Sequence, residues 1–594
     1  MSLRHAFDLE RPAVRAGVGL ALLLLMAVLL VRSSLGKRLV YDEYDNLAYG
    51  FRVLTHGPVL PQSGQRMSIL ALSALGCPSP CRENEVNATE AGRLLVRLPT
   101  IVFTLALGLV LWGWAAEWLG PRPALLALAL YALHPTVLAH GKQVTTDVHA
   151  AFFTAAALWP VWRIFRRRGD GRVNLVLAAA ATTGALVSKY TSVLLLPILA
   201  LAVVGETWRA RREGARLRSR RIAVAVTVFA LLVLLFLNAA YLFEGTLRRA
   251  DSYPWRSRAL QFLSSVPLPL PLPRAFVRGV DFSFQVQEEP GVGRGYNYVL
   301  GQLNTDGVWY AFPLMLLLKT PLAVFALAFL AWRWRPEGEG GRGGWTWLAA
   351  PLAVFLAFFG LLVKPQLGIR YLLPVLPLLI LGAARASAAA TTPSRRRLVA
   401  ILVVWAAVSA QSYHPHYMSY FNEIIGPRVN AYRFLADSNL DWEDRSRDIA
   451  RFRAEHPEIL LVVEPEAPRA GWILVGANKL VGVYEPERYR WLRENFRPER
   501  HVGYSYLLFR VTPERLQEVR SRVSLIDGSS RAGRGRHRAG GRAAYSRSRR
   551  DRSLRLIRAP GVLSRQGWEE SRQLPSPPPV HERSRMPLPS EVAG

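Results

Sequence analysis

The sequence predicts a polytopic α-helical membrane protein that carries a small α/β domain near its C-terminus. Hydrophobic residues make up 51% of the 594 residues, and they gather in blocks that clusters of arginine separate. Apolar blocks of this length between basic loops are typical of a chain that crosses a bilayer several times. The formal net charge of +32 alone would suggest nucleic-acid binding, but many of the arginines flank apolar blocks, which disfavours that interpretation.

About eleven segments are candidate membrane spans by length and hydropathy. The first runs from Val14 to Val31. The others are Leu94–Trp118, Ala124–Ala139, Val148–Phe165, Val173–Ser188, Thr191–Val204, Ile222–Phe243, Trp309–Trp332, Trp345–Val363, Tyr371–Ala384 and Leu398–Ser412. Proline interrupts two of them, at Pro160 and Pro197, which neighbouring helices can tolerate because they satisfy the freed backbone groups.

Arginine-rich loops predict the orientation. Four of them fall on one side if the spans alternate: Arg163–Arg172, Arg209–Arg221, Arg333–Arg342 and Arg385–Arg397. The positive-inside rule makes that side cytoplasmic, and the basic N-terminus agrees. No small-residue cleavage site follows the first span, so we expect an uncleaved anchor rather than a signal peptide. The protein is thus expected in the cell membrane, with the C-terminal domain extracytoplasmic.

The chain divides into three predicted parts. Residues 1–412 hold the spans and two long outer loops, 32–92 and 244–307. In residues 413–511 the apolar blocks give way to short strand-like and helix-like segments, which predict a small extracytoplasmic α/β domain. Residues 512–594 are rich in Arg, Ser, Gly and Pro, and such a composition predicts a disordered tail.

Two shorter features lie in the outer loops. Cys77 and Cys81 are the only cysteines, and an oxidising compartment permits a disulfide between them. A disulfide or free thiols are favoured over a zinc site, which would need two more ligands. The Pro-rich run Val266–Pro273 predicts a stiff, extended segment that acts as a spacer or packs against the membrane face.

Charged clusters gather on the predicted outer face. Asp42 and Glu43 follow the first span directly, and carboxylates at such a place are costly unless they have a function. The other candidates are His140, Lys142 and Asp147 between the third and fourth spans, Lys189 between the fifth and sixth, Arg370 and Tyr371 before the tenth, and Lys319 in the eighth.

These residue types together suggest a particular chemistry. Arginine and lysine clamp a phosphate through charge-assisted hydrogen bonds, and a carboxylate within reach of a hydroxyl can act as a general base. Any one of these lysines by itself is better explained as snorkelling to the interface. The clusters taken together favour a site for an anionic head group beside a catalytic carboxylate.

Several short motifs occur in an order that resembles glycosyltransferase family 39, which includes the protein O-mannosyltransferases and the lipid A aminoarabinose transferases. They span about residues 14–511. They are Asp42-Glu43, Arg97-Leu98-Pro99, Thr145-Thr146-Asp147, Tyr298-Val299-Leu300-Gly301, Trp309-Tyr310-Ala311-Phe312-Pro313, Lys319-Thr320-Pro321, Arg370-Tyr371-Leu372-Leu373-Pro374, Tyr420-Phe421-Asn422-Glu423, Asp437-Ser438-Asn439 and Asp441-Trp442.

The resemblance implies a GT-C fold and a hexosyl- or mannosyl-type glycosyltransferase that uses a polyprenyl-phosphate-linked sugar. It implies an inverting mechanism, in which Asp42 is the general base and Glu43 supports the site. The donor phosphate would be bound by cations drawn from Arg370, Lys142, Lys189, Arg97 and Lys319. The residues expected to bind the acceptor or to shape the site are Asp147, His140 and Tyr371. Asp147 could equally be the N-cap of the fourth span.

No metal site and no obligatory cofactor are expected, and the partners are the lipid-linked donor, the membrane and an acceptor protein, lipid or glycan, with no nucleic acid. The sequence departs from the family after Asp441-Trp442, where Glu443-Asp444-Arg445 replace the frequent Gly-Gln-Asp. The β-trefoil repeats of eukaryotic members are missing, so a protein acceptor is not assigned. Two alternatives stay open: a multi-pass transporter, and an enzyme resembling oligosaccharyltransferases that transfers a whole glycan.

Overall fold

The computed structural model describes residues 11–58, 67–79, 81–212, 219–288, 296–334 and 346–522. All of these residues fall in one compact unit. Most of the tail predicted to be disordered lies outside the described residues. Its beginning does not: residues 513–522 are helical and bury Leu516 and Val519, so the folded part extends beyond residue 511.

Helices occupy all eleven segments predicted to span the membrane. They are α2 (Pro12–Ser34), α6 (Glu90–Leu119), α7 (Pro121–Ala132), α8 (Pro135–His140), α9 (Asp147–Phe165), α10 (Gly171–Ser188), α11 (Leu195–Arg212), α12 (Ser219–Ala240), α14 (Ala311–Lys319), α15 (Leu322–Trp334), α16 (Thr346–Leu361), α17 (Leu376–Ala389) and α18 (Pro393–Gln411). In the described part, six helices are long and apolar enough to cross a membrane, and a seventh span results if α14 and α15, bent by 99°, count as one. The polytopic helical fold is confirmed, while the count of eleven exceeds what length and composition support.

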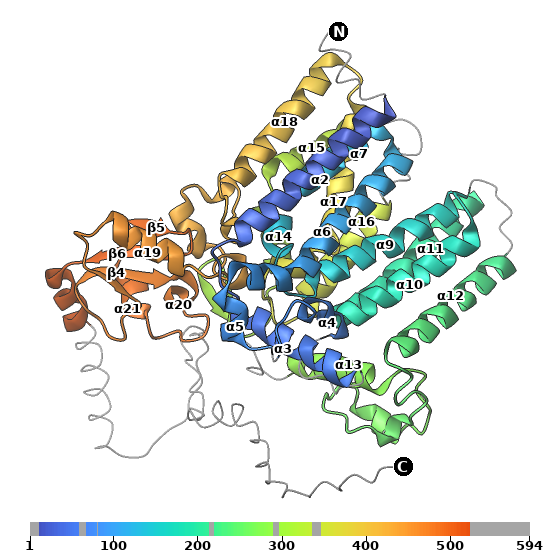
Figure 1. Cartoon of the computed structure of the whole chain (residues 1–594), viewed down its shortest axis with the longest axis horizontal. Helices are drawn as coiled ribbons and strands as arrows, with labels where there is room; N and C mark the ends of the chain where they lie inside the picture. The colour runs from blue at the N-terminus through green and yellow to red at the C-terminus, as the bar shows by residue number, and fades with distance from the viewer. Residues whose placement is uncertain are drawn as a thin grey trace, which may run out of the picture. The chain divides into compact units, whose positions relative to one another are not determined.

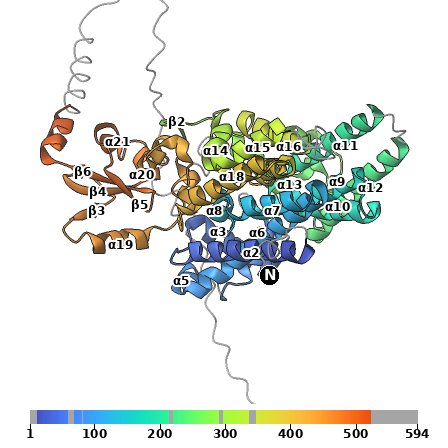
Figure 2. The same ribbon diagram turned by 90° about the horizontal axis from the view of Figure 1, so that it is seen from above.

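The helices pack side by side, and some of the packed pairs are far apart in the sequence. In Figures 1 and 2, α6 lies against α7 and α9, α10 against α9 and α12, and α17 against α7 and α15. Their burial differs in a way that a bilayer explains: 56% of the most apolar stretch of α9 is buried but only 17% of that of α12. Apolar side chains that no protein covers, such as Leu231 and Leu235 of α12, can face lipid because the helix satisfies its own backbone groups.

The first outer loop is mostly helical. It holds α3 (Tyr41–His56), η1 (Ser68–Leu70), α4 (Ala71–Ala74) and α5 (Glu83–Ala88). Leu47 and Val53 of α3 pack on Leu70, and Gly50 sits so close to the backbone carbonyl of Leu70 that a side chain there would collide with it. Cys77 and Cys81 form a disulfide, as the sequence allowed.

The second outer loop contains η3 (Ala250–Ser252), η4 (Gln261–Ser265), α13 (Arg274–Glu288) and an antiparallel hairpin of β1 (Asn297–Val299) and β2 (Gln302–Asn304). Short 3-10 segments also occur between the spans and in the chain that leads into the α/β domain. They are η2 (Tyr190–Leu194), η7 (Ile369–Leu372), η8 (Tyr417–Ser419), η9 (Glu423–Ile425), η10 (Arg428–Arg433) and η11 (Asp437–Asn439).

The predicted small α/β domain is confirmed. Its strands are β3 (Leu461–Val463), β4 (Gly471–Gly476), β5 (Arg500–Val502) and β6 (Tyr506–Val511), in the order β3-β4-β6-β5. The β3–β4 pair is parallel and the other two pairs are antiparallel. Side chains alternate between the faces of a strand, so Leu474 packs with Phe452 of α19 (Ser446–Glu455), whereas Ile473 and Val475 join the main core with α20 (Ala477–Val481) and α21 (Arg490–Asn495).

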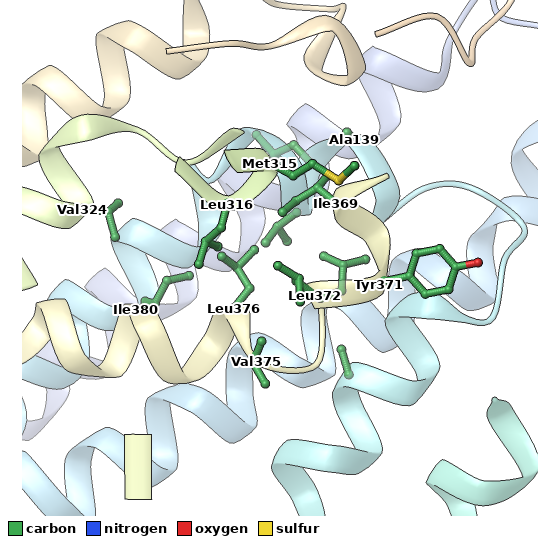
Figure 3. Close-up of a cluster of buried hydrophobic side chains, with 14 of the residues drawn as sticks. Ala139, Met315, Leu316, Val324, Ile369, Tyr371, Leu372, Val375, Leu376 and Ile380 are labelled. Carbon is green, nitrogen blue, oxygen red and sulfur yellow. The ribbon is translucent and has the colours of Figure 1, made fainter. Parts of the chain in front are cut away.

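One contact holds η11 against η7. The backbone N–H of Ile369 donates to Asn439 Oδ1 at 3.0 Å, and Ser438 Oγ donates to the carbonyl of Leu367. Gly368, between them, has φ +127° and lies against Ser438 Oγ. Ile369, Leu372 and Tyr371 are buried in the same apolar cluster as Met315, with the ring of Tyr371 at its edge (Figure 3). The cluster therefore anchors the short segment that carries Arg370.

Gly368→Ala should destabilise the protein, because the added methyl group meets Ser438 and L-residues rarely adopt this backbone conformation. We expect a loss of about 1–3 kcal/mol of unfolding free energy, measured by denaturant or thermal unfolding in detergent. Gly17→Ala is the matched control, since Gly17 is exposed in α2 with open space around it. Equal midpoints for the two variants would contradict the close contact between η7 and η11.

Candidate functional site

The two carboxylates at the start of α3 lie in different environments. Glu43 is fully buried, whereas the side chain of Asp42 keeps 47% of its surface exposed. Neighbouring residues of a helix point in different directions, so α3 turns one carboxylate into the protein and the other outward. The pair predicted from the sequence is therefore split between two roles.

Glu43 is held in place by a bidentate ion pair with Arg97. Its Oε1 accepts from Arg97 Nε at 2.9 Å, and its Oε2 accepts from Arg97 Nη2 at 2.7 Å. The backbone N–H groups of Val144 and Val40 also donate to it, at 3.1 and 3.2 Å. Both carboxylate oxygens are thus occupied, which fits the predicted supporting role of Glu43.

The N–H groups of Arg97 all donate to acceptors inside the protein. Besides binding Glu43, it donates to the carbonyls of Ser34, Lys37 and Arg38 at 3.4, 3.1 and 3.2 Å. A guanidinium has five N–H groups, and these contacts use all of them. The structure therefore favours Arg97 as the residue that fixes Glu43 and the end of α2, not as a ligand of the donor phosphate.

Lys319 is occupied in the same way. Its ammonium donates to the carbonyls of Met418, Tyr420 and Asn439 at 2.8, 2.5 and 2.5 Å. A lysine ammonium has three donors, so none is left for a phosphate. The residue predicted to bind the donor instead ties the end of α14 to the segment that leads into the α/β domain.

A third predicted cation, Lys142, lies in a buried ionic cluster around Glu443. Glu443 contacts Lys142 at 2.7 Å, Lys37 at 2.8 Å and Arg445 at 3.2 Å. Lys142 also donates to the carbonyl of Ser33 at 2.6 Å. Glu443 is one of the residues that departs from the family pattern, and here it neutralises cations that would otherwise be buried without a partner.

The electrostatics of Glu443 follow from this cluster. Burial opposes its ionisation, but the positive charges of Lys142, Lys37 and Arg445 outweigh burial and hold the pKa of Glu443 well below its usual value. The carboxylate is therefore ionised at neutral pH. It joins the end of α2, the loop after α8 and the start of the α/β domain.

Arg370 is a predicted phosphate ligand whose guanidinium N–H groups make no hydrogen bond within the described residues. Its side chain is 16% exposed, lies 3.9 Å from Asp42 Oδ2 and stacks on the ring of Trp442 at 4.4 Å. In the described part of the chain, no side chain or carbonyl accepts a hydrogen bond from its guanidinium. Burial opposes the charge of Arg370, but the nearby carboxylates, Asp147 above all, raise its pKa. An unsatisfied guanidinium beside an exposed carboxylate is suited to bind an anionic ligand.

Lys189 and Asp147 form an ion pair next to Arg370. Asp147 is the first residue of α9, and Thr146 rather than Asp147 is the N-cap, so the capping role considered for Asp147 is not observed. Lys189 is the C-cap of α10 and lies 4.5 Å over the ring of Tyr371, which Arg370 also approaches, at 5.9 Å. A cation over an aromatic face is stabilised by the ring quadrupole, so Tyr371 supports both cations.

His140 is buried beside this group of residues. Its ring lies 6.1 Å from that of Trp442, and its Nδ1 has no hydrogen-bond partner among the described residues. Burial lowers the pKa of His140 to about 3, so the imidazole is neutral at physiological pH. Its unpartnered Nδ1 can accept one hydrogen bond.

Reading the sequence did not assign roles to Trp442, Glu443 or Asp437. Trp442 brings the α/β domain onto Arg370. Asp437 has a left-handed backbone, with φ +57°, and burial raises its pKa to about 6. The motifs that contain these residues were visible, but only the fold shows that η11 meets η7. In the described residues, no group of three or more His, Cys, Asp or Glu side chains is arranged to hold a metal ion.

Residues 89–239 match the family described as dolichyl-phosphate-mannose-protein mannosyltransferase, which confirms over that segment the resemblance predicted from the sequence. Comparison with curated proteins gives no match. Solved structures similar to this chain include ArnT from Cupriavidus metallidurans bound to undecaprenyl phosphate, with 14% identity, a TM-score of 0.43, and coverage of 82% of this chain and 97% of that one. They also include the oligosaccharyltransferase of Archaeoglobus fulgidus in the apo form, with 12% identity, a TM-score of 0.42, and coverage of 74% and 58%.

Glu443→Gln should destabilise the protein strongly, because it leaves the buried ammonium groups of Lys37 and Lys142 without their carboxylate, while Arg445 keeps the ion pair with Asp448, at 3.9 Å. Breaking such a cluster from one side costs about 3–5 kcal/mol, measurable by thermal unfolding in detergent. Glu458→Gln, at an exposed position of the same domain, is the control and should change little.

Acidification checks the same cluster. The stability from Glu443 is present above the pKa of a glutamate in the unfolded chain, about 4.3, and is lost as pH falls through the lower pKa in the folded protein. The wild type should therefore lose its advantage over Glu443→Gln in acid. A constant difference between the two proteins across this pH range would rule out an ionised Glu443.

Proposed function

We propose that this chain, whose residues 89–239 match the dolichyl-phosphate-mannose-protein mannosyltransferase family, is a membrane glycosyltransferase that uses a polyprenyl-phosphate-linked sugar. The sugar passes to an acceptor hydroxyl on the extracytoplasmic face, with inversion at the anomeric carbon. The main support within the site is the pairing of Asp42 with Arg370 at 3.9 Å. In the described chain, both side chains lack the hydrogen bonds that occupy Glu43, Arg97 and Lys319.

Asp42 is the proposed general base. The acceptor hydroxyl gives its proton to the Asp42 carboxylate while its oxygen bonds to the anomeric carbon. The bond between that carbon and the phosphate oxygen breaks, and the lipid phosphate leaves with the electron pair. A base must reach the proton that it removes, and Asp42 is the carboxylate of the pair that reaches outward. Glu43 keeps α3, and hence Asp42, in position through Arg97.

Arg370 is the proposed ligand of the donor phosphate, with Lys189 as the second cation. Negative charge grows on the phosphate as the sugar leaves, and fixed cations stabilise that charge most in a site shielded from water. Lys189 is held by Asp147 and Tyr371, so it is oriented before the donor arrives. Lys142, which was also expected to bind the donor phosphate, is neutralised by Glu443. We therefore assign Lys142 to the buried ionic cluster around Glu443.

The α/β domain contributes Trp442 to the site. Its ring packs on the guanidinium of Arg370, and Glu443 anchors the same segment to Lys37 and Lys142. A planar ring against a guanidinium limits its rotation while leaving its edge N–H groups open. We therefore infer that residues 413–511 position the donor-binding arginine, in addition to any contact with the acceptor.

A transporter fits these observations less well. Ionisable residues that serve transport gather near the middle of the bilayer. Asp147 begins α9 and Lys189 is the C-cap of α10, so both lie at helix ends. Transfer of a whole glycan remains the nearest enzymatic alternative, and a mannosyl or other hexosyl donor is proposed from the family match alone.

Asp42→Asn should abolish sugar transfer, because the amide cannot accept the proton. Loss of a general base typically lowers the rate about 100- to 10,000-fold. The measurement is transfer of radiolabelled sugar from polyprenyl-phosphate donor in membranes, with expression and thermal stability followed alongside. Glu83→Gln, an exposed carboxylate of α5, should be fully active. Near-normal transfer by Asp42→Asn would refute the proposed base.

Arg370→Ala should weaken donor use far more than acceptor use. Hydrogen bonds to a charged group contribute about 1.5–3 kcal/mol, so we expect the KM for donor to rise at least about 10-fold. Arg370→Lys restores the charge but not the paired N–H groups and should recover only part of the loss. Arg451→Ala, on the exposed face of α19, is the control. An unchanged donor KM in Arg370→Ala would contradict this assignment.

A further inference from the structure

The chain that leaves α12 at Ala240 makes an unusual turn that carries apolar side chains outward. Leu242, Phe243 and Leu247 all have positive φ, at +53°, +58° and +63°. Bulky residues rarely adopt this conformation, and holding it is costly unless the surroundings fix it. All three side chains are exposed, so protein packing alone does not account for leucine and phenylalanine at these positions.

The turn continues into an irregular antiparallel ribbon of residues 247–251 and 266–270. The N–H of Leu247 donates to the carbonyl of Leu270 at 2.8 Å, and the N–H of Leu270 donates to that of Arg248 at 3.0 Å. Further along, the N–H of Ala250 donates to the carbonyl of Leu268 at 3.0 Å. These bonds pair the N–H groups of Leu247, Ala250 and Leu270 within the ribbon.

The outer edge of this ribbon is built from proline. Pro267, Pro269 and Pro271 alternate with Leu268 and Leu270, and the leucines make the ribbon hydrogen bonds. The positions whose N–H would point away from the partner segment are therefore the ones that have no N–H. Such an edge presents no unsatisfied donor, which a membrane environment requires of non-helical backbone.

Several large apolar side chains of this region are exposed. Leu242, Phe243, Leu247, Phe262 and Leu268 are each at least 52% exposed. They follow the exposed leucines of α12, the helix with only 17% of its most apolar stretch buried. Clustered exposed apolar side chains mark surfaces that contact a partner or a membrane, and this segment continues directly from the end of α12 (Figure 1).

Polar groups nearby match the boundary of a bilayer. Arg248, Arg256 and Arg258 are exposed at the base of the ribbon, and Trp255 donates its indole N–H to the carbonyl of Ala250 at 2.9 Å. Tryptophan is enriched at the level of lipid head groups, and arginines there reach lipid phosphates while their aliphatic stems stay in apolar surroundings.

We propose that residues 242–270 form a membrane anchor that dips into the interfacial layer of the bilayer beside α12. The partner is the lipid surface, with the leucine and phenylalanine side chains in the acyl boundary and the arginines among the phosphates. This anchor is independent of sugar transfer: it fixes the depth of the second outer loop whatever reaction the protein catalyses.

Depth measurements with spin labels test the anchor directly. The native cysteines form a disulfide, so single cysteines can be introduced and labelled in the full chain after its reconstitution into vesicles of phosphatidylcholine and phosphatidylglycerol. The test variants are Leu247→Cys and Leu268→Cys. Leu231→Cys, on the lipid-facing side of α12, and Leu460→Cys, 83% exposed in the α/β domain, are the apolar and aqueous controls. All four positions are exposed, so the fold should tolerate the label.

Labels at 247 and 268 should be relaxed by oxygen more than by a water-soluble nickel reagent, as at 231 and opposite to 460. The same nickel accessibility at 247 and 268 as at 460 would overturn the proposal. Low accessibility to both reagents would also overturn it, because that result indicates cover by protein instead of lipid. Either result would leave the roles of Asp42 and Arg370 untouched, since those are measured by transfer assays.

Discussion

The buried ion pair between Glu43 and Arg97 is the constraint on which the site depends. Together with neighbouring backbone groups, it satisfies both carboxylate oxygens of Glu43 and all the N–H groups of Arg97. It joins the start of α3 to α6 and to the end of α2. Two charges leave water here only because each finds a full set of partners. With α3 fixed in this way, the exposed side chain of Asp42 lies beside Arg370.

A second buried cluster, around Glu443, joins the α/β domain to the same place. Glu443 neutralises Lys37 and Lys142. The preceding residue, Trp442, packs its ring on the guanidinium of Arg370. The protein therefore uses two sets of buried charges for positioning and leaves a third set, Asp42 with Arg370 and Asp147 with Lys189, in which the side chain of Asp42 is 47% exposed. The division explains why cations that look equivalent in the sequence have different chemical availability: what matters is how many acceptors already surround each one.

Much of the architecture could be read from the sequence. Apolar blocks predicted each helical segment because a bilayer selects for length and composition. Short strand-like segments predicted the strands at 459–463 and 506–509, and an oxidising outer compartment allowed the disulfide. The number of complete spans was overestimated, since α14 and α15 bend sharply at Thr320 and α16 and α17 are short. Hydropathy reports that a segment is apolar but not where its axis turns.

The sequence by itself determined the fold class, the two outer loops, the α/β domain and the set of charged residues from which the site is built. The tertiary structure alone decided which of them are available. Hydrogen bonds and ion pairs with residues elsewhere in the chain, such as Met418 and Glu443, already occupy Arg97, Lys319 and Lys142. The guanidinium of Arg370 makes no such hydrogen bond within the described residues. The physical reason is that a hydrogen-bonding group is free or satisfied only with respect to its neighbours in space, and those contacts link segments that are far apart in the sequence, 54 residues for Arg97 with Glu43 and 99 for Lys319 with Met418.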